Sequence, residues 1–241
     1  MFLADISCEL SRHATQVYLS LRNGAWIAPR LRKGGIPSDI VFLKRANQLI
    51  PQCLLGHIIK HSLEQKYNHT NLGLESDKSP DRLGLVINDE LPHRIVTGSV
   101  LIKSEISQLE KKAIIFKDGS RVEDIDFIIL ATGFEVKLPA LPEFLQPSQK
   151  VIPFYKYVFP PSLKFPTLAV IGAIRVSGPI PPIAELQARW ATRVFLRKCS
   201  LPTKEVMLKD VEKTAAAKLK KFGNNKRVNN VSIATQLKIK F

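Results

Sequence analysis

Arg22 is the residue of this sequence best suited to binding a phosphate. It ends the stretch QVYLSLR, residues 16–22, whose Val, Tyr and Leu content predicts a strand. In a dinucleotide-binding βαβ unit the second strand ends beside the ribose, where an arginine can bind the 2′-phosphate of NADP. A solvated arginine at a strand end is the alternative, and the residue alone leaves both interpretations open.

A second candidate is the strand end at Ala131, Thr132 and Gly133. The apolar letters FIILA run directly into Thr132 and Gly133. A short apolar run bounded by turn residues is typical of a buried strand, and a glycine after it permits a tight exit or a close backbone approach to a ligand. The letters TLAVI before Gly172 predict another buried strand of the same kind.

The residue patterns of several other kinds of catalytic or metal site are missing from the sequence. His57 and His61 have the spacing of a zinc-protease pair, but Ile58 stands where the general-base glutamate is needed. Neither GxSxG nor GxxxxGK[ST] occurs, and the three cysteines form no CxxC pair. We therefore expect no metal site and assign no catalytic side chain. The isolated cysteines indicate reduced thiols in an intracellular protein.

The chain is strongly basic, with a formal charge of +15. Residues 202–241 hold ten lysines and arginines against three acids, so much of the excess lies in a polar tail. Such charge could suit nucleic acid, but this tail has only Phe222 and the terminal Phe241 as stacking platforms. We expect no nucleic-acid partner. No run of about 20 apolar residues is present, so no transmembrane segment is expected either.

The elements that would position these residues follow from hydrophobic spacing and turn signals. Helical spacing predicts an amphipathic helix over residues 3–14 and two helices within 40–67, separated by Pro51. Short strands are expected from Arg94 to the ATG stretch, with Asp118-Gly119 as a hairpin turn. A further helix is expected from about Pro182 to Lys198.

Several stretches, in order, resemble flavin-containing monooxygenases of the vertebrate microsomal, dimethylaniline monooxygenase type. These stretches are DISCELSRHATQVYLSLRNGAWIAPR, LPHRIVTGSVLIK, AIIFKDGSRVEDIDFIILATGF, KYVFPPSLKFPTLAVIGAI and PIAELQARWATRVF. The resemblance covers about residues 3–212, and the ATGF and ELQARWATRVF motifs are specific to it.

The resemblance implies an α/β fold: an incomplete two-dinucleotide-binding (Rossmann-like) flavoprotein fold with a small β-meander. Residues 1–92 would form a partial NADPH-binding domain with inserted helices. Residues 93–212 would form the C-terminal part of the FAD-binding domain, and 213–241 a disordered basic tail.

The implied activity is NADPH- and O2-dependent oxygenation of soft nitrogen or sulfur nucleophiles in small xenobiotics. FAD carries that chemistry, so no nucleophilic side chain is required. By resemblance, Arg22 and Asn23 would bind the 2′-phosphate of NADPH. Ala131-Thr132-Gly133 corresponds to the family's ATG motif, where the chain crosses between domains and a side chain in place of Gly133 would crowd the crossing. Gly172 corresponds to a segment that approaches the flavin.

The sequence also departs from the family. It begins after both GxGxxG loops, and Asn23 stands where many relatives carry a second arginine, so one bidentate phosphate partner would be lost. The flavin-facing loop is altered at Arg175, Ser177, Pro179 and Pro181.

The hydrophobic tail anchor of the family is not found, so the chain resembles a fragment or truncated isoform. We expect such a chain to be inactive alone. The alternative is a catalytically dead isoform that acts as an interaction protein and associates with a full-length relative. The family implies the endoplasmic reticulum membrane, whereas the chain as given is expected to be cytoplasmic or peripheral.

Overall fold

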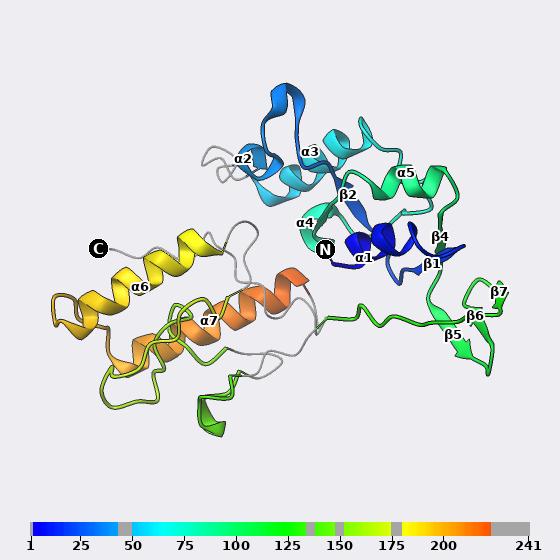
Figure 1. Ribbon diagram of the computed structural model, residues 1–241. Coiled ribbons are helices and arrows are strands. Elements are labelled where there is room, and N and C mark those ends of the chain that lie inside the picture. The colour runs from blue at the N-terminus through cyan, green and yellow to red at the C-terminus, as the bar shows by residue number, and fades with distance from the viewer. Residues whose placement is uncertain (1, 43–49, 134–137, 148–151, 175–179, 223–241) are drawn as a thin grey trace. The chain divides into compact units, whose positions relative to one another are not determined.

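The computed structural model describes residues 2–42, 50–133, 138–147, 152–174 and 180–222. The chain divides into two compact units, an N-terminal unit (Met1–Thr132) and a C-terminal unit (Gly133–Phe241), shown in Figure 1. The predicted domains divide the chain after residue 92 instead. That functional division stays a prediction, and each compact unit is described by itself.

The helices of the N-terminal unit are short. They are α1 (Phe2–Leu10), η1 (Lys33–Gly35), α2 (Ser38–Phe42), α3 (Gln52–Glu64), α4 (Pro80–Leu83) and α5 (Leu91–Val96). The predicted helix over 3–14 is α1, which ends four residues earlier. Pro51 immediately precedes α3, as its role as a helix breaker predicts. Residues 91–96 form a helix where strands were expected from Arg94, so that prediction was wrong for this segment.

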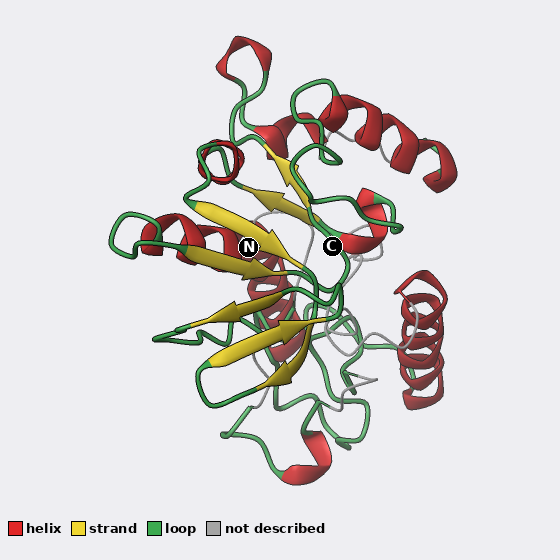
Figure 2. Cartoon of the chain, turned by 90° about the vertical axis from the view of Figure 1, so that its right-hand side faces the viewer, coloured by secondary structure: helices red, strands yellow, loops and turns green. Residues whose placement is uncertain are grey.

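All strands of the described chain, yellow in Figure 2, belong to the N-terminal unit. They are β1 (Val17–Ser20), β2 (Trp26–Ala28), β3 (Leu85–Ile87), β4 (Val100–Lys103), β5 (Ile106–Leu109), β6 (Ala113–Phe116) and β7 (Arg121–Glu123). β1 pairs with β4 and β2 with β3, both in parallel, while β5, β6 and β7 form an antiparallel meander. The predicted meander is thereby confirmed, including a turn in which Gly119 has φ +80°.

The core of the N-terminal unit lies between α1 and the β1–β4 pair. Val17 and Leu19 alternate with less buried neighbours along β1, as one face of a strand against a core requires. They pack with Ala4 and Cys8 of α1 and with Val100 of β4. The apolar faces of α1 and β1, which the hydrophobic spacing predicts, therefore pack together in one core cluster.

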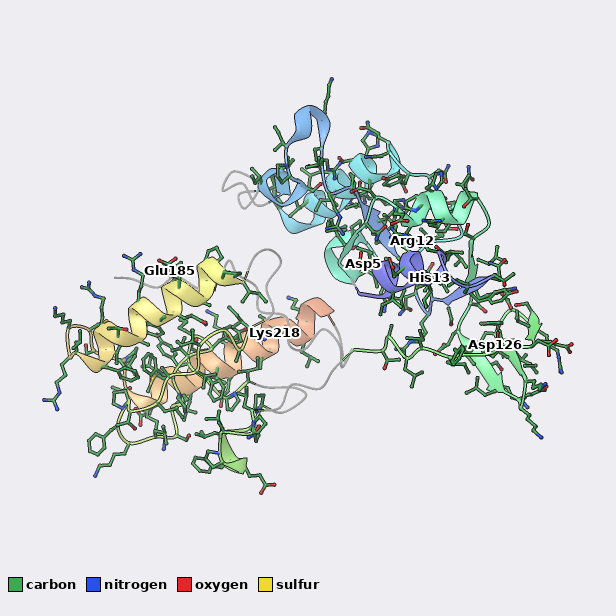
Figure 3. The ribbon with its side chains drawn as sticks, in the orientation of Figure 1. Asp5, Arg12, His13, Asp126, Glu185 and Lys218 are labelled. Carbon is green, nitrogen blue, oxygen red and sulfur yellow. The ribbon has the colours of Figure 1, made fainter. Side chains whose placement is uncertain are left out.

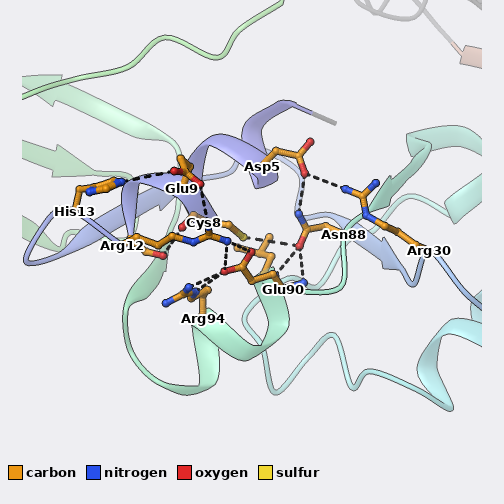
Figure 4. Close-up of polar contacts among 11 residues, drawn as sticks. Asp5, Cys8, Glu9, Arg12, His13, Arg30, Asn88, Glu90 and Arg94 are labelled. Atoms are coloured by element: carbon orange, nitrogen blue, oxygen red, sulfur yellow. Dashed lines mark hydrogen bonds and ion pairs between the residues drawn. The ribbon is translucent and has the colours of Figure 1, made fainter.

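Asn88 ties α1 to α5 within this unit (Figure 4). Its buried side chain accepts hydrogen bonds from the backbone N–H groups of Glu90 (2.9 Å) and Leu91 (2.6 Å) through Oδ1. Its Nδ2 donates to the Asp5 carboxylate at 2.9 Å. Since Asp5 and Asn88 are far apart in sequence, this single amide fixes the start of α5 against α1.

An ion-pair network extends from that contact across the surface of α1 and α5 (Figure 4). Glu90 accepts hydrogen bonds from Arg94 (2.6 Å) and from Arg12 (2.9 Å). These two guanidinium groups lower the pKa of Glu90, the hydrogen bond from Arg94 contributing most. Burial, by contrast, raises the pKa of the Cys8 thiol beneath the network. Cys8 is therefore a protonated core side chain at neutral pH rather than a reactive thiolate.

His69 links a loop to the buried strand β2. Its Nε2 accepts a hydrogen bond from the Ile27 N–H at 3.0 Å, and its ring centroid lies 4.8 Å from that of Trp26. Burial lowers the pKa of His69 below its usual 6.5, because desolvation disfavours the imidazolium. A protonated Nε2 could no longer accept from Ile27.

We therefore predict that acid weakens the N-terminal unit through His69. The unfolded chain takes up this proton near pH 6.5, whereas the folded chain does so only at lower pH. The stability contribution is therefore complete above pH 6.5 and is lost as pH falls from there toward the folded pKa. Urea midpoints measured between about pH 7.5 and pH 5 should fall less steeply in His69→Gln, which keeps an acceptor that does not titrate. Equal slopes would contradict the prediction.

The described part of the C-terminal unit is built from helices and loops. It contains η3 (Glu143–Leu145), α6 (Pro181–Phe195) and α7 (Lys204–Phe222), so the predicted helix at 182–198 is confirmed as α6. One core cluster places the Trp190 ring edge-on to Phe159, with centroids 5.0 Å apart. A second cluster surrounds Phe154 and Tyr157.

The basic tail begins later than the sequence suggests. α7 runs to Phe222, so residues 213–222 are helical instead of disordered, and residues beyond 222 lie outside the described part. Lys218 of α7 (Figure 3) is only 4% exposed, and its Nζ lies 4.6 Å from the centroid of the Tyr157 ring. Desolvation lowers the pKa of Lys218 to about 8. Part of the basic excess thus packs against a core cluster.

The two apolar runs that end at Gly133 and Gly172 form no strand. Residues 127–130 have no regular secondary structure and are exposed, with Phe127 88% and Leu130 79% accessible. The run before Gly172 packs partly against both clusters of its unit, still without strand pairing. The prediction of two buried strands is therefore wrong for this chain. A strand requires a neighbour to accept its backbone hydrogen bonds, and no described strand lies beside either run.

Candidate functional site

Arg22 and Asn23 lie side by side in the turn that follows β1, and both are exposed. The turn is fixed immediately afterwards. Gly24 adopts φ +65°, and the Ala25 N–H donates to the Leu74 carbonyl at 3.0 Å. A fixed turn presenting exposed donors at a strand's carboxyl end is the arrangement expected at the ribose end of a dinucleotide site.

Lys103 lies at the same edge, a residue that the sequence analysis did not single out. The register pairs Ser20 with Lys103, and the Leu21 N–H donates to the Lys103 carbonyl at 2.9 Å. Because β1 and β4 are parallel, their carboxyl ends meet there, and Arg22 follows β1 by two residues. In the sequence, Lys103 stands out only as the last residue of an expected strand. The register of β4 on β1 is what shows that it lies at the same edge as Arg22.

The neighbouring charges at this edge are mostly positive. Lys117 Nζ lies 2.7 Å from Glu105 Oε2, and Lys103 Nζ donates to the Ser120 hydroxyl at 3.1 Å. The pKa of Glu105 is lowered, chiefly by the hydrogen bond from Lys117 and to a lesser degree by the charge of Arg22. Glu105 is thus already neutralised by Lys117. Arg22 and Lys103 leave a positive edge suited to an anion such as a phosphate.

The segment Ala131-Thr132-Gly133 has a different environment. It continues the exposed run that begins after Asp126, labelled in Figure 3 on the chain leaving the meander. Gly133 has φ +97°, and a Cβ added there would meet nothing within 4 Å. Crowding at a crossing between the two domains stays a prediction. A left-handed conformation is the feature that favours glycine at this position.

Gly172 lies in a turn held by helix α6. It adopts φ +74°, and its N–H donates to Oε1 of Gln187 at 3.0 Å. A Cβ at residue 172 would lie 3.9 Å from that of Ala184, an ordinary contact. Of the altered loop positions, 175, 177 and 179 fall outside the described residues, while Pro181 is the first residue of α6.

The predicted site residues thus form separate groups. Arg22 and Asn23 join Lys103 at the β1–β4 edge, whereas Gly172 is joined to Gln187. Ala131 and Thr132 end the N-terminal unit, and Gly133 begins the C-terminal one. Of these groups, the β1–β4 edge is the one that contains charged residues, although the Lys103 Nζ is directed to Ser120 and the Phe116 ring of the meander.

Among the described residues, no three His, Cys, Asp or Glu side chains come together as metal ligands would. The same residues include no helix that is both long and apolar enough to span a membrane.

Parallel strand pairs, a helix packed on the β1–β4 pair and a basic strand edge are features of a partial Rossmann-like α/β fold. The profile of the flavin-binding monooxygenase-like family matches residues 3–236. The chain therefore belongs to that family, which binds flavin and acts on small molecules, and its mixed α/β architecture agrees with a partial Rossmann-like flavoprotein fold.

Individual relatives agree with this assignment. Dimethylaniline monooxygenase [N-oxide-forming] 2 of Oryctolagus cuniculus is 41% identical over 227 residues, covering 92% of this chain and 42% of that protein. Flavin-containing monooxygenase 5 of Rattus norvegicus is 40% identical, covering 92% and 43%. Flavin-containing monooxygenase 2 of Homo sapiens is 39% identical, covering 92% and 42%.

This chain spans less than half the length of those curated relatives. Among solved structures, S-allyl-L-cysteine S-oxygenase from Allium sativum is similar with a TM-score of 0.48 and 31% identity, covering 57% of this chain and 31% of that one.

Proposed function

We propose that this chain is the part of a flavin-containing monooxygenase that contributes to NADPH- and O2-dependent oxygenation of soft nitrogen or sulfur nucleophiles in small xenobiotics, at the endoplasmic reticulum membrane, and that it is inactive on its own. In this proposal residues 1–92 contribute to NADPH binding and 93–212 to FAD binding. The observation that carries it is the edge where the cations Arg22 and Lys103 and the neutral amide of Asn23 follow the ends of β1 and β4. The family to which the chain belongs binds flavin, and a bound flavin provides the oxygen-transfer chemistry.

The residues present fit the two nucleotides unequally. At the β1–β4 edge an exposed guanidinium and an exposed amide are available to donate to a 2′-phosphate. Near Gly172 the backbone N–H is already used by Gln187, and the segment ending at Gly133 is exposed and unpaired. This chain's own residues therefore support a contact to NADPH more fully than an enclosed site for FAD.

A comparison of NADP+ and NAD+ binding tests the 2′-phosphate contact. Arg22→Ala is expected to weaken NADP+ binding by about tenfold or more while leaving NAD+ unchanged, since a charge-assisted hydrogen bond is lost. Asn23→Arg is expected to strengthen NADP+ binding by supplying a second guanidinium. Both are measurable by isothermal titration of the 241-residue chain.

Arg189→Ala is the matched control, because Arg189 is an exposed arginine on α6 with an ion pair to Glu185 at 3.6 Å. It should leave both affinities unchanged. Equal affinities of the unaltered chain for NADP+ and NAD+ would contradict the assignment of Arg22 as a residue that binds the 2′-phosphate. A parallel titration with FAD, followed by flavin fluorescence, decides whether the chain holds FAD near one equivalent.

The second candidate function is an interaction protein that associates with a full-length relative. It is favoured by the exposed apolar run at 127–130, which has the composition of a strand but no strand partner among the described residues. Co-purification with such a relative would support it. Ile129→Pro, which blocks backbone pairing, should then abolish the complex. A complex that forms equally well with this variant would exclude pairing through the run.

A further inference from the structure

The buried face of α6 contains one polar side chain, Gln187. The other buried residues of this helix are Trp190, Ala191 and Val194, which form an apolar stripe. Gln187 itself has no exposed surface. Burying an amide among apolar groups is unfavourable unless its hydrogen bonds are satisfied, so a glutamine here requires partners for both ends of its amide.

The oxygen end of that amide has a partner. Oε1 accepts the Gly172 N–H at 3.0 Å and so joins α6 to the turn at Gly172. In that turn Gly172 has φ +74°, while Ile174, two residues further on, is buried. Gln187 thus holds one peptide group of the turn in a fixed orientation.

The nitrogen end has none. Nε2 of Gln187 is buried and makes no hydrogen bond to any described residue. Buried amide donors in native proteins are nearly always paired, so an acceptor from outside the described chain is expected at this point. The acceptor must be neutral or anionic and must reach a donor that lies beside the Gly172 turn.

We propose that Gln187 is a positioning residue of the flavin site, orienting the Gly172 turn through Oε1 and donating from Nε2 to an acceptor atom of the bound flavin. The inference rests on the proposed function, because it takes FAD as the ligand near Gly172. It adds a residue from α6 that spacing and motifs did not single out.

Two variants separate a contact to the flavin from an effect on the turn. Gln187→Met keeps the side-chain length and removes both hydrogen-bonding ends. Gly172→Ala strains the turn at positive φ but leaves the Gln187 amide intact, since the added Cβ would make only an ordinary contact at 3.9 Å. The readouts are the FAD dissociation constant, the visible absorption bands of the bound flavin and hydrogen exchange of the peptide containing Gly172.

The unaltered chain and the control Arg189→Ala, which changes an exposed arginine of α6, are expected to share the same bound-flavin absorption bands. Gly172→Ala shows how far strain in the turn alone changes hydrogen exchange at Gly172. Gln187→Met is expected to shift those bands and to weaken FAD binding by about tenfold, because a hydrogen bond to the ring is lost. If Gln187→Met speeds exchange at Gly172 but leaves the bands unshifted, Gln187 is structural only and the inference is overturned. If the unaltered chain binds no FAD, the proposed flavin site of this chain fails and the inference fails with it. The two failures are therefore distinguishable.

Discussion

Gly24→Ala is expected to unfold the N-terminal unit or to destabilise it by about 4 kcal/mol or more. A Cβ at residue 24 would lie 2.0 Å from the carbonyl oxygen of Glu75 and 2.6 Å from that of Leu74. Both are backbone atoms, so no side-chain rotation can relieve the clash. The chain would have to separate residues 74–75 from the turn and break the hydrogen bond from Ala25 to Leu74.

The change also bears on function, because Gly24 directly follows Arg22 and Asn23. Losing the turn would displace both donors from the β1–β4 edge, so NADP+ binding should be lost together with stability. Urea unfolding followed by the fluorescence of Trp26 measures the effect, in a Trp190→Phe background so that Trp26 is the only tryptophan.

Gly98→Ala is the matched control for Gly24→Ala. Gly98 has φ +77°, close to the +65° of Gly24, but an added Cβ there would meet nothing within 4 Å. Only the left-handed backbone is penalised, at a cost of about 1 kcal/mol. If the two variants were equally stable, the close approach of Leu74 and Glu75 to Gly24 would be refuted.

Asn88→Ala is expected to destabilise the N-terminal unit by about 3 kcal/mol. It removes the acceptor of two backbone N–H groups at the start of α5, one of them on the buried Leu91, and the donor to Asp5. The Leu91 N–H would remain buried without a partner, which costs more than the loss of an exposed hydrogen bond. Hydrogen exchange at the start of α5 should accelerate along with the fall in the urea midpoint.

Asn68→Ala provides the comparison, since Asn68 Oδ1 accepts the Asn71 N–H at 3.0 Å, three residues on, as Asn88 does from Leu91. That bond is exposed, so water can replace it, and the expected loss is about 0.5 kcal/mol. Similar losses in the two asparagine variants would show that burial of the Asn88 network contributes little.

The two apolar runs show where sequence reasoning fails. Phe127 to Ala131 has the composition of a buried strand, yet in the structure it forms no strand and residues 127–130 are exposed. Composition records a preference for strand, but a strand forms only against a neighbour that completes its hydrogen bonds. Local elements with internal hydrogen bonds were predicted more successfully: α1, α3, α6 and the hairpin at Gly119 depend on residues a few positions apart.

The sequence by itself determined the family, the helices α1, α3 and α6, the hairpin and the candidate phosphate contact at Arg22, because motifs, periodicity and turn residues are local properties of the chain. Only the tertiary structure decided which residues, distant in sequence, lie beside the candidate site residues. Lys103 reaches the same edge as Arg22 through the register of β4 on β1, and Gln187 meets Gly172 through the packing of α6. Such pairings join residues distant in sequence, and they depend on how the chain closes its loops and buries its polar groups, which no local pattern encodes.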